Sequence, residues 1–239
     1  MITADHSFTI GDGRTGFLLI HGLGGTPLEL KFVAKGLARH GFTVHCPQLA
    51  GHCGDESDLL ATDWRDWYAS VEVGLDTLRR RCDTVIAGGL SMGAVLALHL
   101  AAKRQDEVHG LALYAPTLWY DGWAMPWYRF MLSFAMQSPV GRWIVQRFYN
   151  FVETEPYGIK DPTIRAVVVA AMQSGDSTLA GVLTTPGEAV IQLHRLVTVV
   201  KKELPSIDAP AFRRATSDRP TLDRIASGTA ESDSQTSGW

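Results

Sequence analysis

The sequence predicts an α/β fold, a mainly parallel sheet with helices on both faces, and three observations support this. Short apolar runs alternate with amphipathic stretches of helical length from Gly16 to Ala115. Strands that alternate with helices form parallel sheets that are buried on both faces. With 239 residues, 46% of them hydrophobic and 20% charged, the chain can also bury a sizeable core.

The elements of this pattern can be named in order. The expected strands are Phe17–Ile20, Phe42–Cys46, Thr84–Ala87 and Leu111–Ala115, and the expected helices between them are Leu28–Arg39, Asp63–Arg81 and Met92–Lys103. Ligands of such sheets bind outside the carboxyl ends of the strands. The loops that begin at His21, Gln48, Gly88 and Pro116 are therefore expected to share one functional edge.

The alternation stops after Pro116, where no further strand is evident, and an inserted helical cap is expected at about residues 117–185. Helices are expected at Tyr128–Gln137, Val140–Tyr149 and Pro162–Gln173, with a return helix at Pro186–Leu204. The aromatic segment Trp119–Tyr128 either packs the cap on the sheet or forms an apolar wall for an acyl group.

The organisation is thus one domain over residues 1–212, followed by a polar tail at residues 213–239. The tail has few apolar residues and many Ser and Thr, so it is expected to be disordered and to supply no buried strand. The last strands of the sheet are accordingly expected to be missing.

Composition and charge exclude several classes of function. The 22 Lys and Arg against 25 Asp and Glu give a net charge of −3, without the basic stripe of a nucleic-acid-binding protein. No signal peptide and no apolar stretch of membrane-spanning length is expected. Cys46, Cys53 and Cys82 form no CxxC pair, which favours reduced thiols in the cytoplasm and indicates no metal site. The oligomeric state stays open.

The segment Gly89–Gly93 fits the G-x-S-x-G pattern and lies directly between a predicted strand and a predicted helix. Such a sharp turn forces strained backbone angles on Ser91, and glycines on both sides keep neighbouring chain segments from clashing. The hydroxyl would stand at a helix N-terminus, whose dipole favours negative charge. The pattern therefore predicts Ser91 as a nucleophile; the alternative is a plain glycine-rich turn.

The segment His21–Gly25 follows the first central strand, and its glycines allow backbone amides to approach a ligand closely. We expect the amides of Leu23 and Met92 to bind the oxyanion of a tetrahedral intermediate. The alternative is a loop that only closes the strand. For His21 itself a structural role is expected.

Taken together, these segments resemble the α/β-hydrolases of the bacterial carboxylesterase and monoacylglycerol lipase type. The resemblance implies hydrolysis of small-molecule carboxylic esters with short- to medium-chain acyl groups, without a cofactor, through an acyl-enzyme on Ser91. A serine at this position sets aside the dehalogenase branch, which uses a carboxylate nucleophile. The matching segments are Leu18–Gly25, Gly41–Pro47, Ala50–Gly54, Asp63-Trp64 and Ala87–Gly93.

The resemblance weakens where the family carries its acid and base. The family order is serine, then Asp or Glu after one strand, then His after the last strand. Asp218 and Asp223 lie where the acid is expected, but no strand is predicted to position them. His52 and His194 are expected to be structural, and each could act as a base only in a rearranged cleft. The eight histidines are at positions 6, 21, 40, 45, 52, 99, 109 and 194, so none follows the acid.

Activity is therefore expected to be impaired, and other functions remain open. The same scaffold supports thioester hydrolysis, peptide cleavage and acyl transfer. A noncatalytic relative that binds acyl ligands under the cap is a further alternative. The polar tail also suggests a truncated or out-of-frame fragment, whose exposed sheet edge would favour association.

Overall fold

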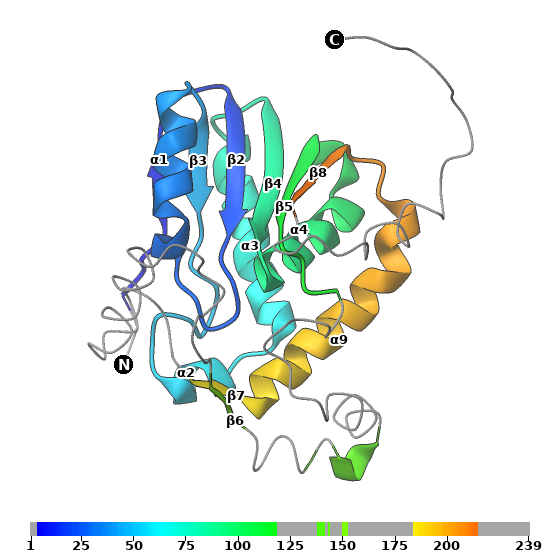
Figure 1. The fold of residues 1–239 in the computed structure, drawn as a ribbon. Helices are drawn as coiled ribbons and strands as arrows, with labels where there is room; N and C mark the ends of the chain where they lie inside the picture. Colours follow the sequence, from blue (N-terminus) through cyan, green and yellow to red (C-terminus); the bar gives the residue numbers. More distant parts are fainter. Residues whose placement is uncertain (1–3, 119–137, 142, 144–149, 153–183, 215–239) are drawn as a thin grey trace.

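The computed structural model describes residues 4–118, 138–141, 143, 150–152 and 184–214 (Figure 1). Its main sheet has six strands in the order β1-β3-β2-β4-β5-β8. β1 runs antiparallel to β3, and all other neighbours are parallel. The predicted fold class is confirmed. The strands are β1 (Phe8–Ile10), β2 (Thr15–Ile20), β3 (Thr43–Cys46), β4 (Thr84–Leu90), β5 (Gly110–Tyr114) and β8 (Ala211–Arg214).

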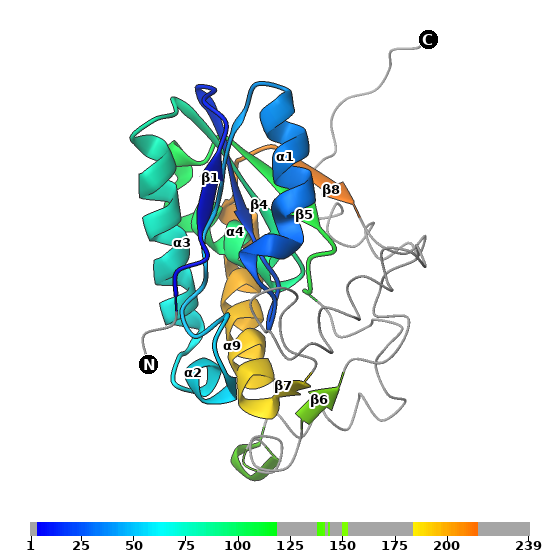
Figure 2. The same cartoon turned by 90° about the vertical axis from the view of Figure 1, so that its left-hand side faces the viewer.

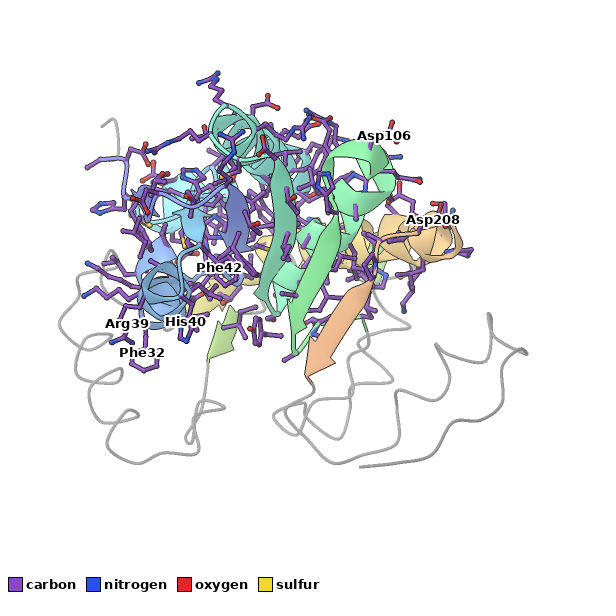
Figure 3. The ribbon with its side chains drawn as sticks, turned by 90° about the horizontal axis from the view of Figure 1, so that it is seen from above. Phe32, Arg39, His40, Phe42, Asp106 and Asp208 are labelled. Carbon is purple, nitrogen blue, oxygen red and sulfur yellow. The ribbon has the colours of Figure 1, made fainter. Side chains whose placement is uncertain are left out.

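Helices cover both faces of this sheet (Figure 2). α1 packs against β1 and β3 on one face, and α3, α4 and α9 lie together on the other. Phe32 on α1 points away from the sheet and is 83% exposed (Figure 3). The helices are α1 (Lys31–Arg39), α2 (Glu56–Leu60), α3 (Trp64–Arg79), α4 (Met92–Lys103) and α9 (Gly187–Glu203), with short 3-10 helices η1 (Pro27–Leu30), η2 (Gln105–Glu107) and η3 (Leu204–Ser206).

The apolar run in β2 shows why the sheet must be covered twice. Successive side chains of a strand point to opposite faces. Leu18 and Ile20 accordingly join the large core with α3 and α4, whereas Leu19 joins a smaller core with α1. All three are buried. A continuous apolar run therefore requires helices on both sides, as the sequence predicted.

Local signals set where the helices begin. Asp63 is the N-cap of α3: its carboxylate accepts hydrogen bonds from the Arg65 and Asp66 amides, and Asp66 bonds back to the Asp63 amide. This capping box places the start of the helix where the sequence predicted it. α4 begins differently, because Ser91 at its N-cap position makes no side-chain capping bond. The Ser91 hydroxyl is thus not engaged by its own helix.

The end of the chain differs from the expectation. A short parallel strand, β8, pairs with β5 from Ala211 to Arg214, so the expected boundary at residue 212 lies inside a strand. Arg213 and Arg214, the first two residues of the expected tail, therefore belong to an edge strand of the sheet. That the tail supplies no buried strand stays a prediction. An edge strand pairs on one side only, and so it tolerates charged residues. Residues 215–239, expected to be disordered, lie outside the described part.

The cap region is described only in part. Two short strands, β6 (Asn150–Val152) and β7 (Thr184–Pro186), pair antiparallel in a region expected to hold none. The return helix is confirmed as α9. The aromatic segment at 119–128, the expected helices at 128–137 and 162–173, and most of the one at 140–149 lie outside the described residues. The cap boundaries at 117–185 stay a prediction.

Two other expectations can be compared with the described residues. Cys46, Cys53 and Cys82 are all buried and carry free thiols. Within those same ranges, the helices are all too short or too polar to cross a lipid bilayer.

The α3 face of the core offers a direct test of this packing. Leu75 is fully buried, and Leu75→Ala is expected to lower the free energy of unfolding by about 2–5 kcal/mol, since it leaves a cavity. The matched control, Val73→Ala, alters a residue of the same helix that is 66% exposed, with an expected change within about 0.5 kcal/mol. Urea denaturation measures both. Equal changes in the two variants would contradict the described burial.

Candidate active site

Ser91 stands at the carboxyl end of β4, in the turn before α4, where the sequence predicted it. Its backbone angles are φ 55° and ψ −112°, outside the regions that non-glycine residues normally adopt. Its amide donates to the Tyr114 carbonyl of the neighbouring strand at 3.0 Å. The side chain is half-buried. This is the sharp, strained strand-to-helix turn that raises a serine hydroxyl above the edge of a sheet.

Gly89 and Gly93 make this turn possible because the backbone of β2 passes very close to it. A Cβ atom on Gly93 would lie 2.0 Å from the Ile20 carbonyl oxygen and 2.6 Å from that of His21. A Cβ atom on Gly89 would lie 2.5 Å from the same Ile20 oxygen. Backbone atoms cannot give way as a flexible side chain can. The two glycines flanking Ser91 are thus required by contact with the strand that carries the expected oxyanion loop.

That loop is a tight turn at the end of β2. The Gly25 amide donates to the Gly22 carbonyl at 3.1 Å, and Gly24, at the third position of the turn, has φ 69°. This is the position at which a type II turn needs a positive φ. The closing bond does not use the Leu23 amide. The loop reaches the serine: a Cβ on Gly22 would lie 3.9 Å from Ser91 Cβ.

Glu29 holds the loop from outside, a contact that the sequence analysis missed. Its Oε1 accepts the Gly22 amide at 2.7 Å. A Cβ on Gly25 would collide with the same carboxylate, at 2.6 Å from Oε2. The turn is therefore fixed by an acceptor on η1 as well as by its own hydrogen bond. A Glu two residues after a Gly-Thr-Pro segment carries no recognisable signal in the sequence.

Met92, the second expected oxyanion donor, is the first residue of α4. Amides in the first turn of a helix have no acceptor within the helix, and the helix dipole places partial positive charge there. The Met92 side chain is fully buried in the core, which fixes the start of the helix. Leu23 lies in the loop after β2, and Met92 begins α4 directly after Ser91. The role of the two amides as oxyanion donors stays a proposal.

Thr117 is a contact of the serine that the sequence analysis did not name. Its Oγ1 lies 2.7 Å from Ser91 Oγ, within hydrogen-bonding distance, and either hydroxyl can be the donor. Thr117 follows β5, in the loop beginning at Pro116 that was expected at the functional edge. The sequence therefore identified the loop but not the residue, because a lone threonine in a loop indicates no particular chemistry.

Two of the histidines considered as bases are buried and hydrogen-bonded to the backbone, which fits a structural role. His21 is fully buried; its Nδ1 donates to the Gly22 carbonyl at 2.9 Å and its Nε2 accepts the Leu49 amide at 3.2 Å. His52 packs edge-to-face on His21 and bonds to the Ala50 carbonyl. Burial lowers the pKa of His21 to about 3 and that of His52 to about 4. Within the described ranges, no histidine is hydrogen-bonded to Ser91.

His194, the third candidate, lies on α9 and is half-buried. Burial, together with the positive charge of Lys201, lowers its pKa. Asp218 and Asp223 lie outside the described residues. No strand was expected to position these aspartates, but β8 ends four positions before Asp218. The absence of a histidine after residue 194 is unchanged.

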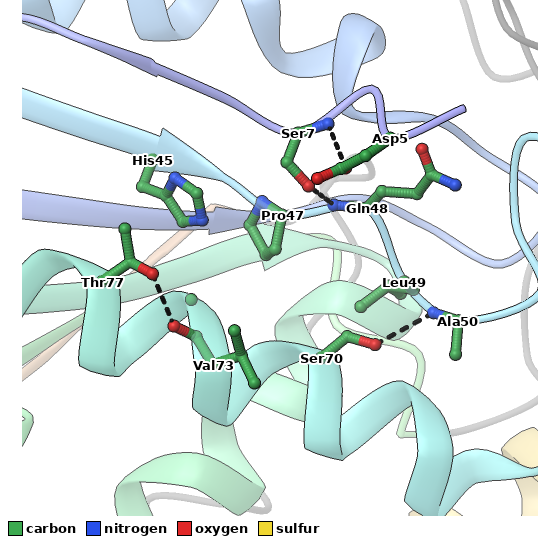
Figure 4. Close-up of a pocket in the computed structure, with 11 residues that line it drawn as sticks. Asp5, Ser7, His45, Pro47, Gln48, Leu49, Ala50, Ser70, Val73 and Thr77 are labelled. Carbon is green, nitrogen blue, oxygen red and sulfur yellow. Dashed lines mark hydrogen bonds between the residues drawn. The ribbon is translucent and has the colours of Figure 1, made fainter. Parts of the chain in front are cut away.

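A separate pocket of about 390 Å³ lies between α3 and the end of β3 (Figure 4). Its polar groups already bond to one another: Ser7 Oγ accepts the Gln48 amide, and Ser70 Oγ accepts the Ala50 amide. Ser91 does not line it. Since few polar groups there are left to meet a ligand, the pocket adds nothing to the chemistry at the serine.

The site can now be compared with known proteins. A sequence profile of the alpha/beta hydrolase family matches residues 17–232, a range that includes most of β2, Ser91 and β8. The chain belongs to the alpha/beta hydrolase family. The predicted resemblance is confirmed, and the family match extends beyond the expected domain boundary at residue 212.

Two curated relatives of this α/β-hydrolase are similar over part of the chain. The thermostable monoacylglycerol lipase of Bacillus sp. (strain H-257) is 40% identical over 106 residues, 44% of this chain and 42% of the relative. The carboxylesterase of Bacillus subtilis (strain 168) is 33% identical over 94 residues, 39% of this chain and 38% of the relative. The matched part thus spans about two fifths of the length of these relatives.

Solved structures share the fold over more of the chain. The monoacylglycerol lipase of Paleococcus ferrophilus has a TM-score of 0.67 at 17% identity, covering 88% of this chain and 76% of that one. A structure from the metagenome-derived lipolytic enzymes LipS and LipT has a TM-score of 0.66 at 23% identity, covering 87% and 74%. At these identities the likeness concerns the fold alone.

The contact between the serine turn and β2 predicts a large effect of one methyl group. Gly93→Ala is expected to destabilise this hydrolase by about 1–3 kcal/mol, because the new Cβ overlaps two backbone carbonyls. Gly36→Ala is the matched control, since nothing lies within 4 Å of a Cβ there and α1 gains helix propensity. Thermal melts of the two variants are compared. A melting temperature of Gly93→Ala equal to that of wild type would refute the close approach.

The buried histidines predict a loss of stability in mild acid. His21 and His52 stay neutral in the fold, but in the unfolded chain they bind protons near pH 6.5. The unfolded state therefore gains protons first, and the free energy of unfolding falls as pH drops below about 6.5, by up to about 1.4 kcal/mol per pH unit for each histidine. Urea denaturation at pH 7, 6 and 5 measures this slope. His52→Gln should reduce this slope by the contribution of one bound proton. A free energy of unfolding that does not change with pH in wild type would contradict the burial of both rings.

Proposed function

We propose that this α/β-hydrolase hydrolyses carboxylic esters through an acyl-enzyme on Ser91. The observation that carries the proposal is the strained Ser91, with the oxyanion loop packed against it at Gly22. The partial likeness to a monoacylglycerol lipase and a carboxylesterase supports an acyl ester as substrate. Short- to medium-chain acyl groups are proposed, on the resemblance of the motifs alone.

The proposed reaction begins when Ser91 Oγ attacks the ester carbonyl carbon. The carbonyl π electrons move to oxygen, and the amides of Leu23 and Met92 donate to the resulting oxyanion. The carbon–oxygen bond to the alcohol then breaks, leaving the acyl group on Ser91. Water attacks this acyl-enzyme in the same way and releases the acid. In the described residues no histidine lies at hydrogen-bonding distance from Ser91 to take the Oγ proton, so this proton passes to solvent and the departing alkoxide takes up a proton from solvent.

Without a histidine beside Ser91 in the described residues, turnover of the ester is expected to be slow. In a serine hydrolase, removal of the base lowers kcat by about 2 million-fold, while the oxyanion donors and binding retain about 1000- to 10,000-fold over water. Both acylation and deacylation need the proton acceptor. An activated ester with a good leaving group speeds acylation but does not speed deacylation. We therefore expect the acyl-enzyme to accumulate.

The lack of a histidine hydrogen-bonded to Ser91 in the described part of the chain favours a second function, which is binding rather than catalysis. In this alternative the protein is a noncatalytic relative that binds acyl ligands. Thioester hydrolysis, peptide cleavage and acyl transfer are alternatives on the same scaffold. A panel of esters, thioesters and peptides, with an added alcohol as acceptor, separates these reactions.

A location in the cytoplasm is also proposed. The three buried free thiols support this reducing compartment.

The test compares wild type with Ser91→Ala on p-nitrophenyl butyrate, after both are shown to melt cooperatively. Wild type is expected to release about one equivalent of p-nitrophenol in a burst and then turn over slowly, because deacylation lacks its base. Mass spectrometry should find the butyryl group on the peptide that contains Ser91. Ser57→Ala, at an exposed serine of α2, is the control and should behave as wild type. Equal rates in wild type and Ser91→Ala would refute the serine mechanism, and saturable binding of butyrate esters without a burst would support the noncatalytic alternative.

A further inference from the structure

The turn after β5 supports Ser91 at two points. The Tyr114 carbonyl accepts the Ser91 amide at 3.0 Å, and three residues later Thr117 Oγ1 lies 2.7 Å from Ser91 Oγ. Between them Ala115 has φ 46°, one of three non-glycine residues with a positive φ in the described part of the chain. Two adjacent strands, whose last paired residues are Leu90 and Tyr114, are thus each followed directly by a residue with positive φ, Ser91 and Ala115.

The strain in this turn is held by its surroundings. The Leu118 amide donates to the Pro116 carbonyl at 2.9 Å, and the Leu118 side chain is buried in the main core. Pro116 restricts the backbone on the other side of Thr117. Unfavourable backbone conformations persist only where neighbouring contacts determine them, and they concentrate at functional sites. The backbone that carries Thr117 is therefore held on both sides, which leaves the Thr117 side chain only its few staggered χ1 rotamers.

The strand order places Thr117 on one particular side of the serine. β4 lies between β2 and β5, so the oxyanion loop approaches Ser91 from one side and Thr117 from the other. A serine hydroxyl has one proton and two lone pairs, and a threonine hydroxyl can meet either. At neutral pH an alcohol does not act as the final proton acceptor. What Thr117 can do is restrict where Ser91 Oγ points.

We propose that Thr117 is a positioning residue that holds Ser91 Oγ towards the carbonyl carbon of an ester whose carbonyl oxygen the oxyanion loop binds. This inference rests on the proposed function, since it concerns the reactivity of Ser91. No proton is transferred to Thr117: in the attack Oγ bonds to the electrophile, its proton leaves to solvent, and Thr117 donates its own hydrogen bond to Oγ. Removing the hydroxyl should slow bond formation without weakening the binding of the acyl group.

A p-nitrophenyl alkylphosphonate ester tests this step without needing turnover. Ser91 Oγ would form a bond to phosphorus, the bond to the aryl oxygen breaks, and p-nitrophenolate leaves as the Oγ proton passes to solvent. The limiting rate of modification and the probe concentration at half that rate are measured separately, with the adduct located by mass spectrometry. The variants are Thr117→Val, which keeps the shape and removes the hydroxyl, and Thr117→Ser, which keeps the hydroxyl. Thr77→Val is the control; it removes a hydroxyl that bonds to the Val73 carbonyl within α3.

Thr117→Val is expected to lower the limiting rate about five- to tenfold, the size of one lost hydrogen bond, with half-saturation changed less than about twofold. Thr117→Ser and Thr77→Val should stay within about twofold of wild type, and all variants should melt as wild type does. If Thr117→Val does not fold, Thr117→Ala replaces it with the same expectation.

Three results would overturn the inference while Ser91 is still modified. The first is an unchanged limiting rate in Thr117→Val. The second is an equal loss of rate in Thr117→Ser, which would show that the methyl group of Thr117 matters. The third is a change confined to the half-saturating probe concentration, which would show that Thr117 affects only the shape of the binding pocket. Failure of the proposed function gives another pattern. In that case wild type forms no adduct, or Ser91→Ala is modified at the same rate, and the role of Thr117 is then refuted along with it.

Discussion

The site depends on the contact between the turn after β4 and the end of β2. At Gly89 and Gly93 there is no room for a Cβ atom between the two backbones, since the Ile20 and His21 carbonyls already occupy that space. This contact brings the N-terminus of α4, where Met92 lies, beside the loop at Gly22–Gly25, which contains Leu23. Without it, Ser91 would still lie on a strained turn, but that loop would not reach it. Two glycines thus connect the fold to the chemistry.

The buried histidine at position 21 extends that constraint to the next strand. Its ring bridges the Gly22 carbonyl after β2 and the Leu49 amide after β3, so it ties the oxyanion loop to the loop that contains His52. A ring with both nitrogens engaged and a pKa lowered to about 3 by burial is neutral across the physiological range. The same bonds that make His21 a good support exclude it as a base. On the outer side Glu29 restrains Gly22 as well, so this loop is held from two directions.

Much of the fold could be predicted from the sequence, because buried parallel strands and capped helices leave strong patterns. Met92–Lys103 was predicted to the residue, and the Asp63 capping box marked the start of α3. β1 and β8 were missed, since each is an edge strand that is short and only weakly apolar. At the site, the motif predicted the strained position of Ser91 and the glycine-rich loop beside it, while the roles of both stay a proposal. Thr117 could not be found, because its contact depends on the positive φ of Ala115, and an alanine gives no sign of that conformation.

The strand order also limits what can complete the reaction. The loop at Gly22–Gly25, which carries the proposed oxyanion donor Leu23, takes the β2 side of Ser91, so the β5 and β8 side, where Thr117 contacts Oγ, is the side left for the acid and base of the proposed reaction. β8 runs parallel to β5, and the chain therefore leaves it at the edge where Ser91 lies, with Asp218 and Asp223 still to follow. A carboxylate is thus available in the sequence beyond that strand, but a histidine is not, as the last is His194. If Leu23 and Met92 act as the proposed oxyanion donors, a serine with no histidine at hydrogen-bonding distance in the described part of the chain is expected to form an acyl-enzyme with an activated ester more readily than it releases it.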